Sequence, residues 1–299
     1  MLEKLKYGLY NSFFSAMALL PFSVLYGISD FLYLIFYKGL KYRNVVVKRN
    51  LRNSFPEKSE AELLEIEKDF YHQLCDNIVE TVKLLHISDK EVDRRIKVSG
   101  TEIVDRCAAE GHPVIVYLGH YGNWEWVTAV ARQYKVPDFS AQVYKPLHDK
   151  AFDKLMLKLR SRFGSISIPK SSVLRSLLKW RNEGKKFVIG FISDHRTNSD
   201  TPHNTTLFLN QETSLVAGGE EIGNRINAAY LFLDVEKTAR GHYQLTFKEI
   251  IPNDNAINYP YTRRYMEMFE ENIRRRPGLW LWSHKRWLPK DNNQSNKSI

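Results

Sequence analysis

The amino-acid sequence predicts an α/β fold with a mostly parallel central sheet flanked by helices, preceded by an N-terminal membrane-anchoring helix. Short apolar runs of strand composition alternate with segments of helical periodicity through most of the chain. One such run ends in a turn containing glycine and histidine and resumes at once with helical spacing. Because a helical crossover between neighbouring strands makes them parallel, we expect helices on both faces of the sheet.

Strands and helices are expected to alternate along the chain. The predicted strands span residues 95–98, 114–118, 139–144, 187–192, 230–235 and 243–250. The predicted helices span residues 59–85, 102–109, 149–163, 173–182 and 220–227. Ser59 and Glu62 have the spacing of a capping box, and Gly111 and Gly184 follow two of the helices as stop signals.

Composition narrows the class of protein. With 299 residues, of which 43% are hydrophobic, the chain can form one large domain or two small ones. Cys75 and Cys107 have no metal-ligand spacing, which favours a reducing compartment over secretion. A formal net charge of +10 indicates an acidic partner: a membrane surface, nucleic acid, a phosphorylated substrate or an acidic carrier protein.

A long apolar segment near the N-terminus predicts a membrane anchor. Between Tyr7 and Tyr37 the only charged residue is Asp30, and the segment is long enough to cross the ~30 Å hydrocarbon layer. Pro21 and Asp30 interrupt it, so a helix embedded in one leaflet is the alternative to a span. Six cations follow with no acid among them: Lys38, Lys41, Arg43, Lys48, Arg49 and Arg52. By the positive-inside rule, the domain behind this flank lies on the cytoplasmic face of the membrane.

A second basic segment, near the C-terminus, is interleaved with tryptophan. Its cations are Arg274, Arg275, Arg276, Lys285, Arg286 and Lys290, with no acid between them. Tryptophan beside cations suits a surface at the level of the lipid headgroups. The same composition could indicate nucleic-acid binding, but no nucleic-acid fold signature accompanies it.

The sequence GHYGNWEW holds the candidate catalytic residues. His120 lies in the turn after the 114–118 strand, and Glu125 lies in the first turn of a predicted helix whose apolar spacing runs through residues 126–134. Gly119 and Gly122 permit an unusual backbone path, and Asn123 is placed as an N-cap. In an open α/β sheet, ligands bind beyond the carboxyl ends of the strands. The alternative is a capping glutamate beside a hydrogen-bonded core histidine.

Motifs for several common chemistries are missing from the sequence. It contains no G-x-S-x-G elbow, H-E-x-x-H helix, Walker A loop or G-x-G-x-x-G fingerprint, and we expect neither a metal nor a cofactor. A His–carboxylate pair without a protein nucleophile suits general-base activation of a substrate hydroxyl, with Glu125 orienting the imidazole of His120. Acyl transfer to an alcohol fits this arrangement best.

Five sequence blocks and the apolar N-terminus resemble one known family. The blocks are GHYGNWE, YKPLHDKAFDKLMLKLRSRFG, FISDHRTNSD, FLNQETSLVAGGEEIGNRINAAYL and PGLWLWSHKRW. In this order they are similar to the bacterial lipid A biosynthesis acyltransferases, the late lauroyl and myristoyl transferases of the lysophospholipid/glycerophosphate acyltransferase superfamily. The resemblance covers nearly the whole chain.

The resemblance implies an enzyme with His120 and Glu125 as catalytic residues. The expected acyl donor is an acyl carrier protein thioester, and the expected acceptor is a hydroxyl of a lipid A precursor. Membrane lipids are the other expected partners, nucleic acid is not a partner, and the expected location is the cytoplasmic face of the cell inner membrane. The implied division of the chain is an anchor at residues 1–40, an acyltransferase catalytic domain at 41–290 and a disordered tail at 291–299.

Four further residues are predicted to bind substrate: Lys145, Arg160, Asp194 and Arg286. Asp194 ends a predicted strand at the same sheet edge as His120, so it binds the acceptor, supports the active site or caps the next turn. Lys145 and Arg160 are suited to holding phosphate, although a cation on an amphipathic helix, as at Arg160, equally suits a solvated face.

Three departures from the family pattern leave the acceptor and the acyl length open. Lys145 stands where most members carry arginine, which keeps the charge but loses bidentate phosphate recognition. Arg196 stands where an acid is usual, and the small-residue block lacks its usual threonines. The alternatives are an acyltransferase for another lipid acceptor, such as an amino lipid or lysophospholipid, and an inactive membrane scaffold.

Overall fold

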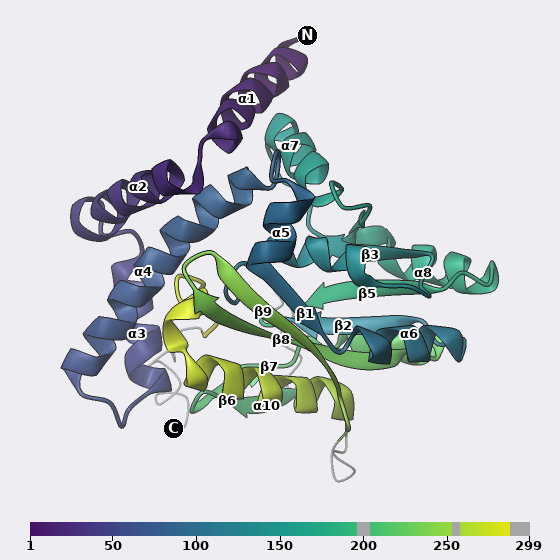
Figure 1. Cartoon of the computed structure of the whole chain (residues 1–299). Helices are drawn as coiled ribbons and strands as arrows, with labels where there is room; N and C mark the ends of the chain where they lie inside the picture. Colours follow the sequence, from purple (N-terminus) through teal and green to yellow (C-terminus); the bar gives the residue numbers. More distant parts are fainter. Residues whose placement is uncertain (196–203, 253–257, 288–299) are drawn as a thin grey trace, which may run out of the picture.

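The computed structural model describes residues 1–195, 204–252 and 258–287. Its centre is a seven-stranded sheet flanked by helices (Figure 1). The strands are β1 (Ile96–Ser99), β2 (Val114–Leu118), β3 (Phe139–Tyr144), β4 (Ile166–Pro169), β5 (Phe187–Ile192), β8 (Ala229–Ala239) and β9 (His242–Glu249). Their order is β1-β9-β8-β2-β5-β3-β4, and only the β8–β9 pair is antiparallel among these neighbours. The predicted mostly parallel α/β sheet is confirmed.

The helices flank the sheet or pack on one another, and most of the predicted ones lie within a few residues of their expected bounds. They are α3 (Asn44–Ser54), α4 (Glu60–Lys83), α5 (Asp89–Arg95), α6 (Thr101–Ala109), α7 (Lys150–Arg160), α8 (Val173–Asn182), α9 (Gly218–Ile226) and α10 (Pro260–Arg275). A two-stranded hairpin, β6 (Thr205–Phe208) and β7 (Gln211–Ser214), lies beside α10 (Figure 1). The capping box at the start of α4 is formed, because Ser59 and Glu62 each accept a backbone N–H of the other.

Strand β2 lies in the middle of the sheet and is buried along its whole length. It pairs with β8 on one side and with β5 on the other. The helix predicted after it is a 3₁₀ helix, η2 (Trp126–Gln133), rather than a regular α-helix. The connection after β2 runs to β3 and the connection after its neighbour β5 runs back to β8, in opposite directions across the sheet, so the carboxyl ends of β2 and β5 lie at a topological switch point.

The N-terminal segment forms two helices instead of the single anchor helix that was predicted. Helices α1 (Leu2–Leu19) and α2 (Phe22–Tyr33) meet at Pro21. Proline lacks the backbone N–H that would continue α1, and it restricts Leu20, which is extended with a ψ of 145°. In the described part of the chain, no one helix has the length and apolar character needed to cross a membrane. The segments Leu2–Leu19 and Phe22–Gly39 reach that length and apolar character only when they are taken together, with a bend of 115° between them.

Helix α2 packs against α4, and this contact accounts for its polar residues. Leu25, Ser29 and Tyr33 form its buried face, and the Ser29 hydroxyl donates to Asp76 over 2.8 Å. Asp30, the one charge in the apolar segment, forms an ion pair of 2.6 Å with Arg240 in the turn between β8 and β9. The protein itself therefore supplies the partner for the carboxylate that interrupted the predicted anchor.

Candidate active site

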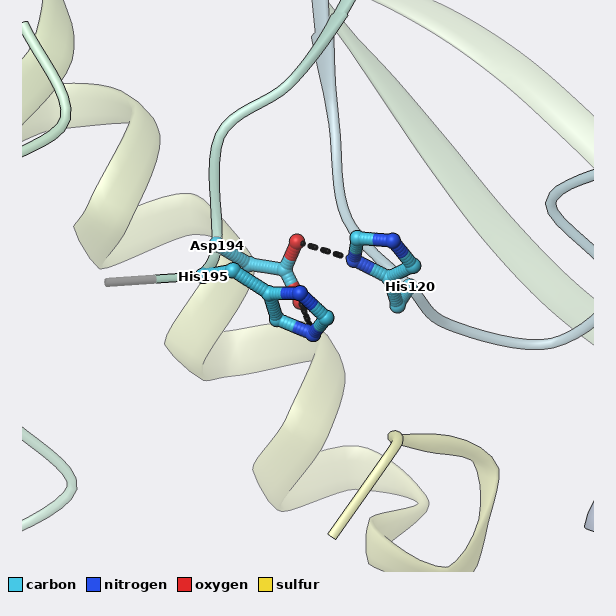
Figure 2. A group of neighbouring side chains, drawn as sticks. All are labelled: His120, Asp194 and His195. Atoms are coloured by element: carbon cyan, nitrogen blue, oxygen red, sulfur yellow. Dashed lines mark hydrogen bonds and ion pairs between the residues drawn. The ribbon is translucent and has the colours of Figure 1, made fainter. Parts of the chain in front are cut away.

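Two adjacent strands bring His120 and Asp194 together at the switch point. In the parallel pair β2–β5, Leu118 lies opposite Ile192, so the residues two positions later also lie opposite each other. The His120 Nδ1 atom lies 2.8 Å from the Asp194 Oδ1 atom (Figure 2). This pair joins residues 74 positions apart, and its geometry is that of an imidazole held by a carboxylate.

Asp194 is fully buried and fixed by neighbours on several segments. Its Oδ1 atom is bonded to His120, and its Oδ2 atom accepts a hydrogen bond of 2.8 Å from the Trp280 indole. Its backbone oxygen accepts a hydrogen bond from Arg286. Burial alone raises the pKa of a carboxyl, but the adjacent imidazoles of His120 and His195 and the hydrogen bonds from His120 and Trp280 hold the pKa of Asp194 well below its ordinary value. Asp194 is therefore an ionised support for His120.

Glu125 was expected to orient the imidazole of His120, but its carboxylate pairs with Arg160 instead. Arg160 at the end of α7 donates from Nε to Oε2 over 2.8 Å and from Nη2 to Oε1 over 2.5 Å. The expectation was wrong because the carboxylate, at the start of η2, is directed toward α7 while Asp194 occupies Nδ1 of His120. The Glu125 side chain is 10% exposed and that of Arg160 22%, so this bidentate pair is largely shielded from water.

The trio His120, Asp194 and His195 has ligand atoms within 4.8 Å of one another, close enough by distance to hold a metal ion. The rings of His120 and His195 are stacked, however, with centroids 3.7 Å apart and planes 8° from parallel (Figure 2). An imidazole binds a metal through a lone pair in its own ring plane, at about 2.0–2.1 Å for zinc. Two stacked rings do not aim these lone pairs at one ion, so this arrangement does not suit a metal centre.

The comparison with known proteins covers almost the whole chain. Residues 1–289 match the family described as bacterial lipid A biosynthesis acyltransferase. The chain belongs to this family. One relative, the lipid A biosynthesis lauroyltransferase of Escherichia coli (strain K12), is 22% identical over 270 residues, which are 90% of this chain and 86% of the relative. The chain is an acyltransferase of lipid A biosynthesis, as the sequence resemblance predicted.

The acyltransferase supports the turn after His120 with residues of α4 that the sequence did not single out. Asn123 was predicted as the N-cap, but Glu125 occupies that position of η2. The Asn123 side chain accepts the Trp126 backbone N–H over 3.3 Å, and its amide donates to Glu80 over 2.8 Å. The Trp126 indole donates to the Glu80 backbone oxygen, and Asn77 donates to the Gly122 oxygen, each over 2.8 Å. Burial raises the pKa of Glu80, which has no exposed surface. Helix α4 thus fixes the turn that follows His120.

The other two predicted substrate-binding residues of the acyltransferase are placed differently. Lys145 follows β3 at the same sheet edge, is exposed, and has no hydrogen bond or ion pair to another described residue. Arg286 is 1% exposed and lies behind Asp194 with its guanidinium 4.9 Å from the Phe208 ring centroid. Burial lowers the pKa of Arg286 to about 10. Its hydrogen bond to the Asp194 backbone oxygen supports the loop that carries Asp194.

Gly119, the residue before His120, has no room for a side chain. A Cβ atom there would lie 2.1 Å from the Phe269 ring of α10. Gly119→Ala should therefore lower the free energy of unfolding by about 1–3 kcal/mol through overpacking and should reduce activity by displacing His120. Gly218→Ala is the matched control, because nothing lies within 4 Å of the added Cβ there. Denaturant unfolding of both variants checks this, and equal stability would contradict the close packing at Gly119.

Proposed function

We propose that this acyltransferase transfers a fatty acyl group from an acyl carrier protein thioester to a hydroxyl of a lipid A precursor, with His120 as the general base. The observation that carries the proposal is the His120–Asp194 pair at the switch point of the sheet. The carboxylate occupies Nδ1, and the His120 side chain is 21% exposed, which leaves Nε2 as the nitrogen for the substrate. A base with one nitrogen anchored and the other accessible is suited to taking a proton from an alcohol.

The proposed reaction has two proton movements. His120 Nε2 takes the acceptor hydroxyl proton as the oxygen attacks the thioester carbonyl and the new C–O bond forms. The C–S bond then breaks, and the leaving sulfur takes the proton back from the imidazolium. Asp194 stabilises the imidazolium between these steps and holds Nδ1–H in place, the role that a buried carboxylate has in hydrolase triads.

Glu125 and Arg160 have a different role in this proposal. Glu125 uses two of the five N–H donors of the Arg160 guanidinium, so three donors stay available to substrate. A guanidinium held by a buried carboxylate is a rigid donor for the thioester oxygen or for a phosphate of the acceptor. Lys145, exposed at the same edge, is proposed to contact an acceptor phosphate.

We also propose that the enzyme binds the cytoplasmic face of the inner membrane through its first 45 residues. Twelve of the 19 large hydrophobic residues exposed in the described chain belong to this segment. On α1 they recur at helical spacing: Leu2, Leu5, Leu9 and Phe13, each at least 60% exposed. An exposed apolar helix face followed by a basic flank is typical of a helix that lies in one leaflet.

Removing this apolar face should weaken membrane binding without disturbing the core. We expect the combined variant Leu5→Gln, Leu9→Gln and Phe13→Gln to bind vesicles of anionic phospholipid at least about tenfold more weakly, because each lost apolar contact is worth about 1.5–3 kcal/mol when fully buried. High salt should remove the residual binding, which rests on the basic flank. Leu207→Gln, at a 70% exposed site on β6, is the control. Equal vesicle binding by the triple variant and the control would contradict the α1 contact.

The identity of the donor can be tested by its dependence on salt. The net charge of +10 suits an acidic carrier protein, and attraction between exposed charges fades as ionic strength rises. We expect kcat/KM for the carrier-protein thioester to fall steeply between low and physiological salt. A coenzyme A thioester of the same chain length should be the poorer donor, because it lacks the protein surface. Equal efficiency for both donors with a flat salt profile would rule out the carrier protein.

A further inference from the structure

Three imidazole rings form a continuous stack that begins at His120. His120 and His195 have ring centroids 3.7 Å apart at 8° between planes, and His195 and His284 have centroids 3.7 Å apart at 3°. The three rings come from segments far apart in the chain: the loops after β2 and β5 and the C-terminal segment. Trp124 adds an edge contact to His120, with centroids 5.1 Å apart at 71°. Neighbours other than Asp194 therefore fix the plane of the His120 ring.

The two histidines stacked behind His120 are neutral. Burial lowers the pKa of His195 to about 3, with His120, His284 and Arg286 acting in the same direction and Asp194 opposing them. Burial also lowers the pKa of His284, and His120, Arg286 and Arg43 add to this against the opposing charge of Asp194. Parallel rings at this distance accommodate one positive charge far better than two.

Hydrogen bonding does not account for the positions of the His195 and His284 rings. The His195 Nε2 and His284 Nδ1 atoms are buried and have no hydrogen-bond partner among the described residues. His195 Nε2 lies 3.9 Å from Asp194 Oδ2, which is beyond hydrogen-bond distance, whereas His120 bonds to Asp194 over 2.8 Å. Burying a polar nitrogen without a hydrogen bond costs free energy, so the stacking contacts of these rings must provide a benefit that offsets this cost.

We propose that His195 and His284 are positioning residues that clamp the ring of His120 in the plane in which Nδ1 meets Asp194 and Nε2 faces the acceptor hydroxyl. A single hydrogen bond fixes the direction of Nδ1 but leaves the ring free to tilt, because the terminal torsion of histidine is broad. A stacked neighbour removes that freedom. Misplacement of a reacting group by about 1 Å can cost about 100-fold in rate. This inference rests on the proposed role of His120 as the base.

The test compares loss of the ring with loss of its nitrogens. We expect His195→Ala to lower kcat by about 10- to 100-fold with little change in KM, because the acceptor still binds but meets a displaced base. His195→Phe keeps a flat ring and should recover most of the lost turnover. Since His195 is neutral at working pH, the acidic limb of the kcat profile should stay at its wild-type position in His195→Phe and should follow a single proton. The pair His284→Ala and His284→Phe repeats the comparison at the far end of the stack if His195→Ala does not fold.

The control is His72→Ala, which removes a histidine that stacks on Tyr33 at 3.6 Å, in the contact between α4 and α2. The clamp would be overturned if His195→Ala and His284→Ala both kept wild-type turnover. It would also be overturned if the phenylalanine variants at these two positions were as impaired as the alanine variants. Parallel assay of His120→Ala separates the two proposals. An inactive His120→Ala with an active His195→Ala removes only the clamp, whereas an active His120→Ala removes the base and the clamp together.

Discussion

Replacing His120 with alanine should lower kcat by about 10²- to 10⁴-fold, the contribution that a positioned general base makes. The variant should stay folded, because Asp194 keeps its hydrogen bonds from Trp280 and Arg286. Asp194→Asn should be impaired on a similar scale, since an amide cannot stabilise the imidazolium and can favour the wrong tautomer. Steady-state kinetics of both variants, alongside thermal unfolding, checks the expectation.

His112→Ala is the control for His120, because it removes an imidazole that bonds the Asn227 backbone on the exposed surface. It should keep wild-type turnover. A His120→Ala variant with more than half of wild-type kcat would exclude His120 as the base. Full activity in Asp194→Asn would instead leave His120 in place and remove the supporting role of the carboxylate.

The second large effect is expected at the Glu125–Arg160 pair. Breaking a buried, bidentate pair leaves one charge without its partner, so Glu125→Gln and Arg160→Gln should each lower kcat at least about 100-fold. If the two side chains act as one unit, the double variant should be no worse than the weaker single variant. Arg160→Lys should also be impaired, because lysine cannot reproduce the fork geometry.

Asp93→Asn is the matched control for this pair. It neutralises a carboxylate that bonds Arg132 in a second Arg–carboxylate pair, one in which Asp93 is 53% exposed. An exposed pair of this kind contributes little to stability, so activity should be unchanged. If Glu125→Gln kept wild-type turnover, Glu125 would have only a structural role in the turn. The proposal that it holds the Arg160 guanidinium for substrate would then be contradicted.

The sequence predicted the sheet and the position of His120 at its edge, because both depend on local patterns. Apolar runs of strand length, a capping box and stop glycines are all read within a few residues of one another. The partner of His120 could not be found in this way. The spacing from His120 to Glu125 suggested a pair, but strand register selected Asp194, 74 residues further along the chain. The one available signal was that Asp194 ends a strand at the same sheet edge.

Other elements were missed for separate physical reasons. The β6–β7 turn places Leu209 and Asn210 at positive φ, of 50° and 61°, without the glycine that usually announces such a turn. Helix α10 was detectable, because Tyr265, Phe269 and Ile273 repeat at helical spacing on its buried face. The predicted tail at residues 291–299 lies outside the described residues.

The sequence did not predict how the apolar N-terminus folds into two helices, because hydropathy records composition and not partners. Pro21 was visible as an interruption, yet the sequence could not show that α2 packs on α4 or that Asp30 pairs with Arg240. A polar residue within an apolar segment can find its partner in water or in another part of the protein, and the sequence of the segment does not say which.

The most direct test of the account is acyl transfer by the purified enzyme to a defined lipid A precursor. Wild-type protein and His120→Ala would each be incubated with an acyl carrier protein thioester, the precursor, a lysophospholipid and an amino lipid, and the products measured by mass spectrometry. We predict that wild type adds one acyl group as an ester to the lipid A precursor and that His120→Ala does so at least about 100-fold more slowly. Acylation of one of the other lipids in place of the precursor, or equal product from both proteins, would contradict the account.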